Sequence, residues 1–193
     1  MRILLAGLLV LVVAAGAVAL WPRSDNDAVS VCGPTGSTPE EIGVAAAGNA
    51  TLCLLNQERT SRGLAPLAQN GLLARAARQH SEDMVRRSYF EHTSPDGVTV
   101  QDRIRATGYA NGGSASTGEN ILWAIGKKTS PSAIVDKWMH SPPHRADILR
   151  RSFTDIGVGI ALGAPNLPGQ AQGQGATYTT DFGGVFDPSL GSG

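Results

Sequence analysis

The sequence predicts an α+β fold, and the order of its periodic segments carries that prediction. Helical patterns fill the chain up to about residue 139, whereas the clearest strand patterns come after it. Residues 156–162 (I-G-V-G-I-A-L) and 177–182 (T-Y-T-T-D-F) read as strands, and the Gly/Pro/Gln-rich stretch between them is typical of a long hairpin loop. A shorter apolar run at 120–125 is a further strand candidate. Helices first and antiparallel strands later favour α+β over alternating βαβ units.

The first two helices are predicted from apolar spacing and from residues that begin or end helices. Residues 49–62 have helical spacing, and Gly63 follows where a helix would stop. Residues 70–87 form a longer pattern, with Asn70 in a good N-cap position. His80 falls on the apolar stripe of this second pattern, so it is expected to be a hydrogen-bonded core histidine rather than a ligand.

Two further helices are predicted after residue 98. One covers 99–106. Ser130-Pro131 opens the other, because serine caps helices well and proline suits the first helical position. Pro142-Pro143 is expected to end it. Trp138, within this helix, is expected to pack the helix onto the sheet.

The N-terminal segment indicates export. Residues 3–20 are an unbroken apolar run after Arg2, and Ala17-Val18-Ala19 places small residues where signal peptidase requires them, so cleavage after Ala19 is predicted. The alternative is retention as a membrane tether, because the run approaches the roughly 20 residues that span a bilayer. The chain is therefore expected outside the cytoplasm, either secreted or anchored facing outward.

These patterns divide the 193 residues into four parts. Residues 1–19 are a signal peptide or signal-anchor, and 20–48 are a flexible linker rich in Ser, Asp, Pro and Gly. Residues 49–187 are the globular domain, which is long enough to bury a substantial core. Residues 188–193 are a disordered tail.

The cysteine content and the charge balance indicate a disulfide-bonded protein without a nucleic-acid partner. Cys32 and Cys53 are the two cysteines, and in an exported chain they predict one disulfide; two free thiols are the alternative. Closing that loop contributes about 3 kcal/mol by chain entropy. Lys plus Arg equals Asp plus Glu, at 16 each, so no basic excess points to a nucleic-acid partner. A monomer is expected.

Several short polar motifs share one resemblance. In chain order from residue 54 to 183 they are L-L-N-Q-E-R-T-S-R-G-L-A-P-L, H-S-E-D-M, Y-F-E-H-T-S-P-D-G, G-E-N-I, W-M-H-S-P-P-H-R-A-D-I-L, F-T-D-I-G-V-G and D-F-G. Each is weak alone, but together and in this order they resemble the bacterial branch of the CAP superfamily, also called the SCP or pathogenesis-related-1 kind. The resemblance implies a three-layer α-β-α sandwich around a small central antiparallel sheet.

The resemblance also implies an open cavity lined by two histidines and acidic residues. Carried over, the histidines are His92 and His144, and the first acid is Glu119. The position of the second acid, three residues after Trp138, holds Ser141, so this chain lacks one acid. Ser141, Asn120 and Arg145, which lie within these motifs, are expected to support the cavity.

Two interpretations of this residue set stay open. Two neutral imidazoles and a carboxylate suit a borderline divalent cation such as Zn²⁺, with affinity that falls as pH drops through about 6.5. Alternatively, His92, Glu119 and His144 form a hydrogen-bonded cluster that ties helix, turn and sheet together.

Three functions follow from the resemblance and the motifs. The first is a non-catalytic extracellular binding module for a small apolar ligand, a lipid, an envelope component or a protein. The second is a metal-dependent hydrolase or protease, in which His92, Glu119 and His144 hold the ion and Glu119 or a free histidine is the candidate catalytic base. No G-x-S-x-G or H-E-x-x-H motif is present, and Thr93, Ser94 and Ser141 are nucleophile candidates by proximity alone. The third is a structural envelope protein held by its N-terminal segment.

Overall fold

The computed structural model describes residues 31–111, 113–165 and 175–185. The predicted signal segment 1–19, the start of the predicted linker and the predicted tail 188–193 lie outside these residues. Within them, no helix is long and apolar enough to cross a membrane.

The chain forms helices, mostly in consecutive groups, and the strands of one mixed sheet. The helices are α1 (Pro39–Ile42), α2 (Val44–Thr60), α3 (Gly71–Arg87), α4 (Val100–Ala106), the short 3₁₀ helix η1 (Gly126–Thr129), α5 (Pro131–Met139) and α6 (Pro142–Ile148). The strands are β1 (Ala68–Gln69), β2 (Ala115–Ile125), β3 (Asp155–Leu162) and β4 (Gly175–Val185). Their order in the sheet is β1-β3-β4-β2, antiparallel except for the short parallel β1–β3 pair.

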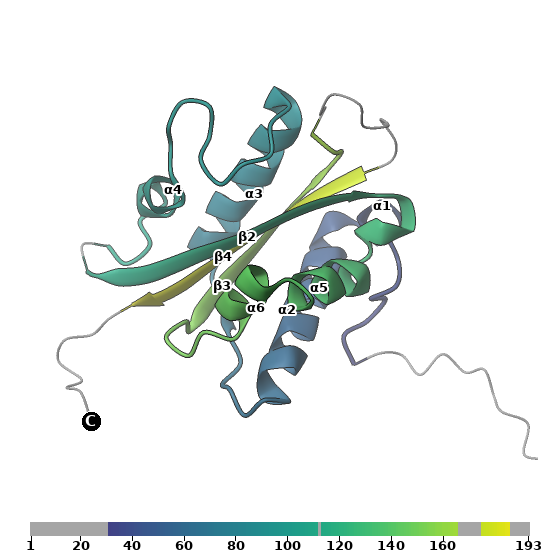
Figure 1. The fold of residues 1–193 in the computed structure, drawn as a ribbon, viewed down its shortest axis with the longest axis horizontal. Coiled ribbons are helices and arrows are strands. Elements are labelled where there is room, and N and C mark those ends of the chain that lie inside the picture. The colour runs from purple at the N-terminus through teal and green to yellow at the C-terminus, as the bar shows by residue number, and fades with distance from the viewer. Residues whose placement is uncertain (1–30, 112, 166–174, 186–193) are drawn as a thin grey trace, which may run out of the picture.

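The sheet is the middle of three layers. Figure 1 shows it running between α3 and α4 on one side and α2, α5 and α6 on the other. The larger apolar cluster, which includes Trp138, Phe153 and Tyr178, fills the α2–α5 side. A smaller cluster, which includes Leu73 and Ile104, lies between α3 and α4. The predicted α+β class and α-β-α sandwich are confirmed.

Two glycines in β3 set how closely α3 approaches the sheet. A Cβ on Gly157 would lie 2.0 Å from the backbone nitrogen of Ala74, and a Cβ on Gly159 would lie 2.0 Å from that of Arg78. Both distances are far below any real contact, so only glycine lets the α3 backbone rest directly on the strand. The I-G-V-G pattern therefore brings the α3 side chains against the sheet, where the candidate site lies.

The predicted linker 20–48 is wrong for residues 39–48. Thr38 caps α1 through a capping box with Glu41, Pro39 occupies the first turn, and Gly43 joins α1 to α2 with a φ of 85°. The alanine-rich stretch that follows then extends α2 back to Val44, five residues before the predicted start. The predicted disulfide is present: Cys32 and Cys53 are bonded, and they join this segment to α2.

The four predicted helices are present as α2, α3, α4 and α5, whereas α6 was missed, as α1 was. Asn70 caps α3 by accepting from the amides of Leu72 and Leu73. The Pro142-Pro143 pair does follow the end of α5, but it also opens α6 at its first two positions. Proline is compatible with a first helical turn, since the amide it lacks would have no intrahelical partner there. Strand β2 begins at Ala115, five residues before the predicted start.

Candidate functional site

Glu119 is the centre of a buried polar cluster on the α3 side of the sheet. It lies in β2, its side chain is inaccessible to solvent, and each of its oxygens has a cationic or imidazole partner. His92 Nδ1 lies 2.7 Å from Oε1, and Nη2 of Arg103 donates to Oε2 at 2.6 Å. Burial alone would raise the pKa of Glu119, but the His92 hydrogen bond and the Arg103 charge hold that pKa below its ordinary value. Glu119 is therefore an ionised, fully engaged carboxylate.

Arg103 joins the loop after α3 to this carboxylate. It projects from α4, whose start is fixed by a capping box between Thr99 and Asp102. Its Nη1 donates to the carbonyls of His92 at 2.9 Å and Val98 at 3.2 Å. One guanidinium thus holds both the loop backbone and Glu119, which is the planar, multiple-donor geometry that arginine provides.

His80 is the core histidine that the α3 stripe predicts. It is 1% exposed, and its Nε2 lies 3.0 Å from the carbonyl of Glu91 and 3.8 Å from Glu119 Oε1. Burial lowers the pKa of His80 and outweighs the opposing charge of Glu119, so the neutral ring is favoured. Donation from Nε2 to Glu91 then holds the start of the His92 loop against α3.

Asp181 is a second buried acid behind Glu119. The two residues face each other on β2 and β4, and Asp181 is fully buried. Neither carboxyl oxygen of Asp181 has a donor partner among the residues that the structure describes. Burial, followed by the charge of Glu119, raises the pKa of Asp181 well above its ordinary value. A protonated Asp181 beside an ionised Glu119 is the arrangement that this geometry favours.

His144 approaches the cluster from α6, on the other side of the sheet edge. Its carbonyl accepts from Nδ2 of Asn120, the neighbour of Glu119, at 3.0 Å, so Asn120 links α6 to β2. Burial and the nearby charge of His92 lower the pKa of His144. Its Nδ1 is buried with no hydrogen-bond partner in the described part of the chain. The structure thus joins His92 to Glu119 and Asn120 to His144 by hydrogen bonds, on adjacent positions of one strand.

Ser141 and Arg145, the other predicted supporting residues, lie at the start of α6 and within it. Ser141 precedes α6 without a side-chain cap, and its carbonyl accepts from the Arg145 amide at 2.9 Å. The Arg145 side chain is exposed. Neither side chain bonds to His92, Glu119 or His144 within the described residues. Both serve the start of α6, since Pro142-Pro143 begins a helix there.

The arrangement of donors does not fit a bound divalent cation. Among the described residues, no group of three His, Cys, Asp or Glu side chains is placed to hold a metal ion. The position of an ion beside Glu119 is already taken by the Arg103 guanidinium and by His92 Nδ1. A cation would have to displace a charge-assisted pair from a buried carboxylate, which is costly.

The same contacts disfavour Glu119 as a general base. Both of its oxygens already accept hydrogen bonds, and its lowered pKa makes it a weak proton acceptor. Ser94, one of the candidate nucleophiles, accepts from the Val98 amide at 3.2 Å and serves the turn instead.

Sequence reasoning missed Arg103 and Asp181. Asp181 left one signal, because a charged residue inside the T-Y-T-T-D-F strand is unusual in a central strand buried on both faces. Arg103 left none, since it reads as one of several arginines on the polar face of a short helix.

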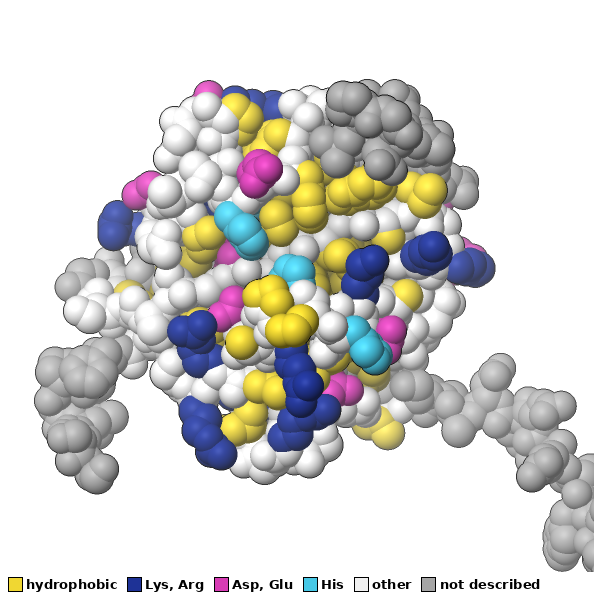
Figure 2. Space-filling view, viewed as in Figure 1, with side chains coloured by type: hydrophobic (Ala, Val, Ile, Leu, Met, Phe, Trp, Pro, Cys, Tyr) yellow, Lys and Arg dark blue, Asp and Glu magenta, His cyan; other side chains and the backbone are white. Residues whose placement is uncertain are grey.

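An apolar groove lies along the sheet edge near this cluster. It has a volume of about 740 Å³, within the range of small-molecule sites. It is lined by Phe90, Leu122, Trp123, Ala124, Ile125, Lys128, Ala133, Asp136 and Lys137. Figure 2 shows hydrophobic side chains gathered on this face between histidines and Lys/Arg side chains.

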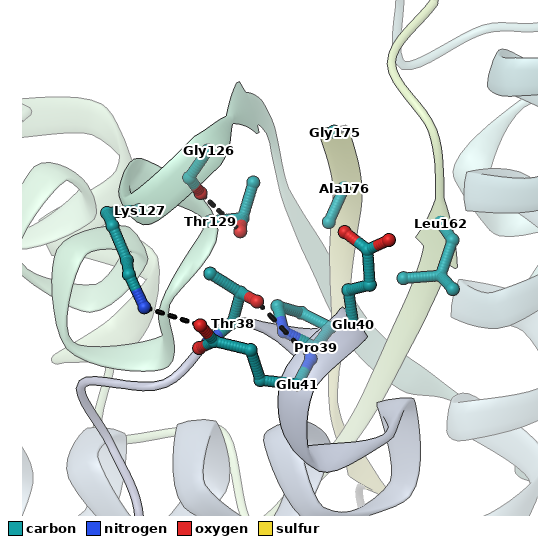
Figure 3. A pocket seen from close by; sticks show the side chains of 10 residues that line it. All are labelled: Thr38, Pro39, Glu40, Glu41, Gly126, Lys127, Thr129, Leu162, Gly175 and Ala176. Atoms are coloured by element: carbon teal, nitrogen blue, oxygen red, sulfur yellow. Dashed lines mark hydrogen bonds and ion pairs between the residues drawn. The ribbon is translucent and has the colours of Figure 1, made fainter. Parts of the chain in front are cut away.

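A second hollow of about 390 Å³ lies between α1, η1 and the ends of β3 and β4. Figure 3 shows Lys127 reaching Glu41 across it, and the two side chains form an ion pair. Thr129 Oγ1 donates to the Gly126 carbonyl at 2.7 Å, which closes the η1 turn on its far side. None of the three predicted cavity residues, His92, Glu119 and His144, lines this hollow.

Two curated relatives share part of this sequence. The Bacillus subtilis protein YkwD is 42% identical over 106 residues, which are 55% of this chain and 39% of that protein. The B. subtilis membrane protein YlbC is 37% identical over 109 residues, 56% of this chain and 30% of that protein. The chain thus matches well under half the length of either relative.

Solved structures share the fold. An extracellular protein containing an SCP domain from Bacillus anthracis superposes with a TM-score of 0.58 at 28% identity, over 76% of this chain and 43% of that chain. An outer surface protein from Borrelia burgdorferi has a TM-score of 0.58 at 18% identity, over 78% of this chain and 96% of that chain, which shows the fold alone. The model of the cysteine-rich secretory protein family matches residues 52–167, more than half of the chain. Together with the α-β-α sandwich and the G-E-N and H-T-S motifs, this match shows that the chain belongs to the CAP superfamily, as a bacterial member of the cysteine-rich secretory protein family.

Proposed function

We propose that this chain is an exported, non-catalytic binding module, in which the Glu119 cluster is a scaffold and the groove along β2 holds the ligand. The observation that carries this proposal is the state of Glu119. Its oxygens are engaged by His92 and Arg103, and the Asp181 carboxyl lies behind it. A carboxylate with no free lone-pair direction toward solvent is suited to fixing the His92 loop rather than to activating water.

The apolar groove along β2 is the proposed ligand-binding site. Phe90 follows α3 on the loop that carries His92, and Trp123 lies four residues after Glu119 in β2. The groove wall is therefore built from the loop and the strand that the His92–Glu119 hydrogen bond joins. A concave, mainly apolar site with few polar groups is the usual form of a binding pocket. Its ligand class covers small apolar molecules, lipids, envelope components and protein segments.

Export is part of the proposal. It is supported by the apolar segment 3–20, by the Cys32–Cys53 disulfide and by the extracellular SCP-domain protein that this chain resembles. Mass measurement of the protein recovered from the medium distinguishes cleavage after Ala19 from a retained anchor.

Native mass spectrometry of the exported protein tests the binding function. The parent protein is expected to carry a bound mass that Trp123→Ser loses. Leu162→Ser is the matched control, because Leu162 is 53% exposed and lies outside the groove. Glu119→Gln is expected to retain the ligand if its fold is intact by circular dichroism. A parent protein with no bound mass, together with turnover of a peptide or ester that Glu119→Gln abolishes, would overturn the proposal in favour of a hydrolase.

A further inference from the structure

The free edge of the sheet is strand β2. It pairs with β4 on one side and has no strand on the other within the described residues. Figure 1 shows this strand crossing the front of the domain, with α5 and η1 beside its end. An edge strand presents backbone donors and acceptors that can pair with another extended segment.

The hydrogen bonds of β4 show which β2 residues face outward. The carbonyls of Gly175 and Gly183 accept hydrogen bonds from the amides of Gly163 and Thr154. The backbone N–H and C=O groups of odd-numbered β4 residues therefore point toward β3. Successive residues of a strand point their backbone groups in opposite directions. Even-numbered β4 residues therefore bond β2, and their partners are the even-numbered β2 residues.

It follows that Ile121, Trp123 and Ile125 direct their N–H and C=O groups away from the sheet. The carbonyl of Ile121 already accepts from Nε1 of Trp138 at 3.4 Å. No such side chain pairs with the backbone of Trp123 in the described part of the chain. Ile125 is the N-cap of η1, so its carbonyl serves the first turn of that helix and its N–H is the outward ladder group. These outward groups lie in the apolar groove, since both residues line it.

The two walls of the groove differ in chemistry. The Glu119 side chain faces the α3 side of the sheet. Side chains alternate along a strand, so those of Trp123 and Ile125 face the same side, as Phe90 does. The other wall is formed from α5 and η1 and carries Lys128 and Lys137. A segment laid along β2 would therefore meet only apolar side chains on one face, and ammonium groups beside Leu122, Ala124 and Ala133 on the other.

The two lysines have no carboxylate partner among the described residues. The neighbouring charges are already used within the chain: Lys127 pairs with Glu41, and the Asp136 carboxylate lies 3.2 Å from His140. Lys128 and Lys137 are exposed at the groove. Their charges favour an acidic occupant.

We propose that the edge from Ile121 to Ile125 binds an extended peptide segment as an added strand, with apolar and acidic side chains alternating along it. Backbone pairing with Trp123 and Ile125 supplies affinity, and the two walls supply the alternating preference. This proposal rests on the proposed binding function and names its partner class. The unused ladder groups favour a peptide over an acyl lipid, which has no backbone donors to satisfy them.

The probe is a fluorescein-labelled peptide of alternating valine and glutamate residues. We expect saturable anisotropy, together with slowing of amide hydrogen exchange at Trp123 and Ile125 by at least about tenfold. N-methylation of alternate peptide amides, which blocks the ladder, is expected to abolish both signals. A peptide with lysine in place of glutamate is expected to bind at least about tenfold more weakly.

Charge reversal tests the lysine wall. Lys128→Glu and Lys137→Glu are expected to weaken binding of the valine–glutamate peptide. Arg151→Glu is the control, because it makes the same charge change at an exposed residue outside the groove, and it is expected to leave binding unchanged. Equal binding of the N-methylated peptide, or no protection of Trp123 and Ile125, overturns the added-strand proposal. If decanoate displaces the native ligand while no peptide binds, this inference fails and the binding function stands.

Discussion

Arg103 and Glu119 form the ion pair on which the candidate site is built. The guanidinium comes from α4 and is 11% exposed, the carboxylate comes from β2 and is inaccessible, and Nη2 donates to Oε2 at 2.6 Å. Since the same guanidinium also binds the His92 carbonyl, the pair connects helix, loop and sheet.

Arg103→Ala is expected to destabilise the domain by about 3–5 kcal/mol, because it leaves a buried carboxylate without its charged partner. Urea unfolding followed by circular dichroism measures the change. Arg105→Ala is the control: Arg105 lies on the same helix, is 77% exposed, and its pair with Asp102 is a surface contact whose loss costs no more than about 1 kcal/mol. Equal effects of the two substitutions would contradict a central role for Arg103.

Gly157→Ala and Gly159→Ala are each expected to destabilise the domain strongly. The added methyl would lie 2.0 Å from the α3 backbone, so the helix itself must move, and the cost should reach or exceed the about 1–3 kcal/mol typical of overpacking. Gly48→Ala is the matched control, because Gly48 lies inside α2 with no atom within 4 Å of an added Cβ. The control is expected to be neutral or stabilising, by up to about 1 kcal/mol. Thermal unfolding of the three variants checks both expectations.

Much of the fold could be predicted from the sequence because local signals and tertiary packing agree. Asn70 and Ser130-Pro131 mark helix starts, and the strand patterns around residues 156–162 and 177–182 match β3 and β4. The α1 segment was missed because its Ser, Pro, Thr and Gly content is equally typical of a loop. Its helix depends on the capping box at Thr38, which is a matter of a few side-chain hydrogen bonds.

The candidate site could be predicted only in part. The family motifs indicate His92, Glu119 and His144, and the structure joins the first two directly. The motifs do not indicate the charged and acidic neighbours of Glu119. These are Arg103 and Asp181, which lie in a short helix and in a strand. Their effect on Glu119 depends on burial and on distances between segments, which no local pattern contains.

Removal of the disulfide is expected to lower stability without abolishing the fold. Cys32 and Cys53 join the segment before α1 to α2, and loss of their loop closure costs about 3 kcal/mol. The double substitution Cys32→Ser/Cys53→Ser avoids a lone thiol. Its midpoint in urea should match that of the reduced parent protein. Equal midpoints for the oxidised and reduced parent would contradict the expectation.

The parent protein is expected to lose stability as pH rises, and Asp181→Asn is expected to reduce that loss. Burial and the charge of Glu119 raise the folded-state pKa of Asp181. The contribution of protonated Asp181 to folding stability is therefore fully present below its unfolded-state pKa and is lost as pH rises through its folded-state pKa. The isosteric amide cannot ionise and can still donate to Glu119. The melting temperature of the parent should therefore fall with rising pH more steeply than that of Asp181→Asn. Parallel curves would show that Asp181 does not titrate in this way.

Zn²⁺ is expected to bind weakly or not at all to the intact site. The Glu119 hydrogen bond raises the pKa of His92, so a proton competes with a metal for that ring, and Arg103 occupies the other carboxylate oxygen. Calorimetric titration of the parent at about pH 7.5 and about pH 5.5 should give no saturable heat at either value, on both sides of the ordinary histidine pKa. His92→Ala and His144→Ala are then expected to titrate like the parent. Saturable heat at the higher pH that disappears at the lower pH and in both variants would instead establish a metal site, and would require Arg103 to leave Glu119 when the ion enters.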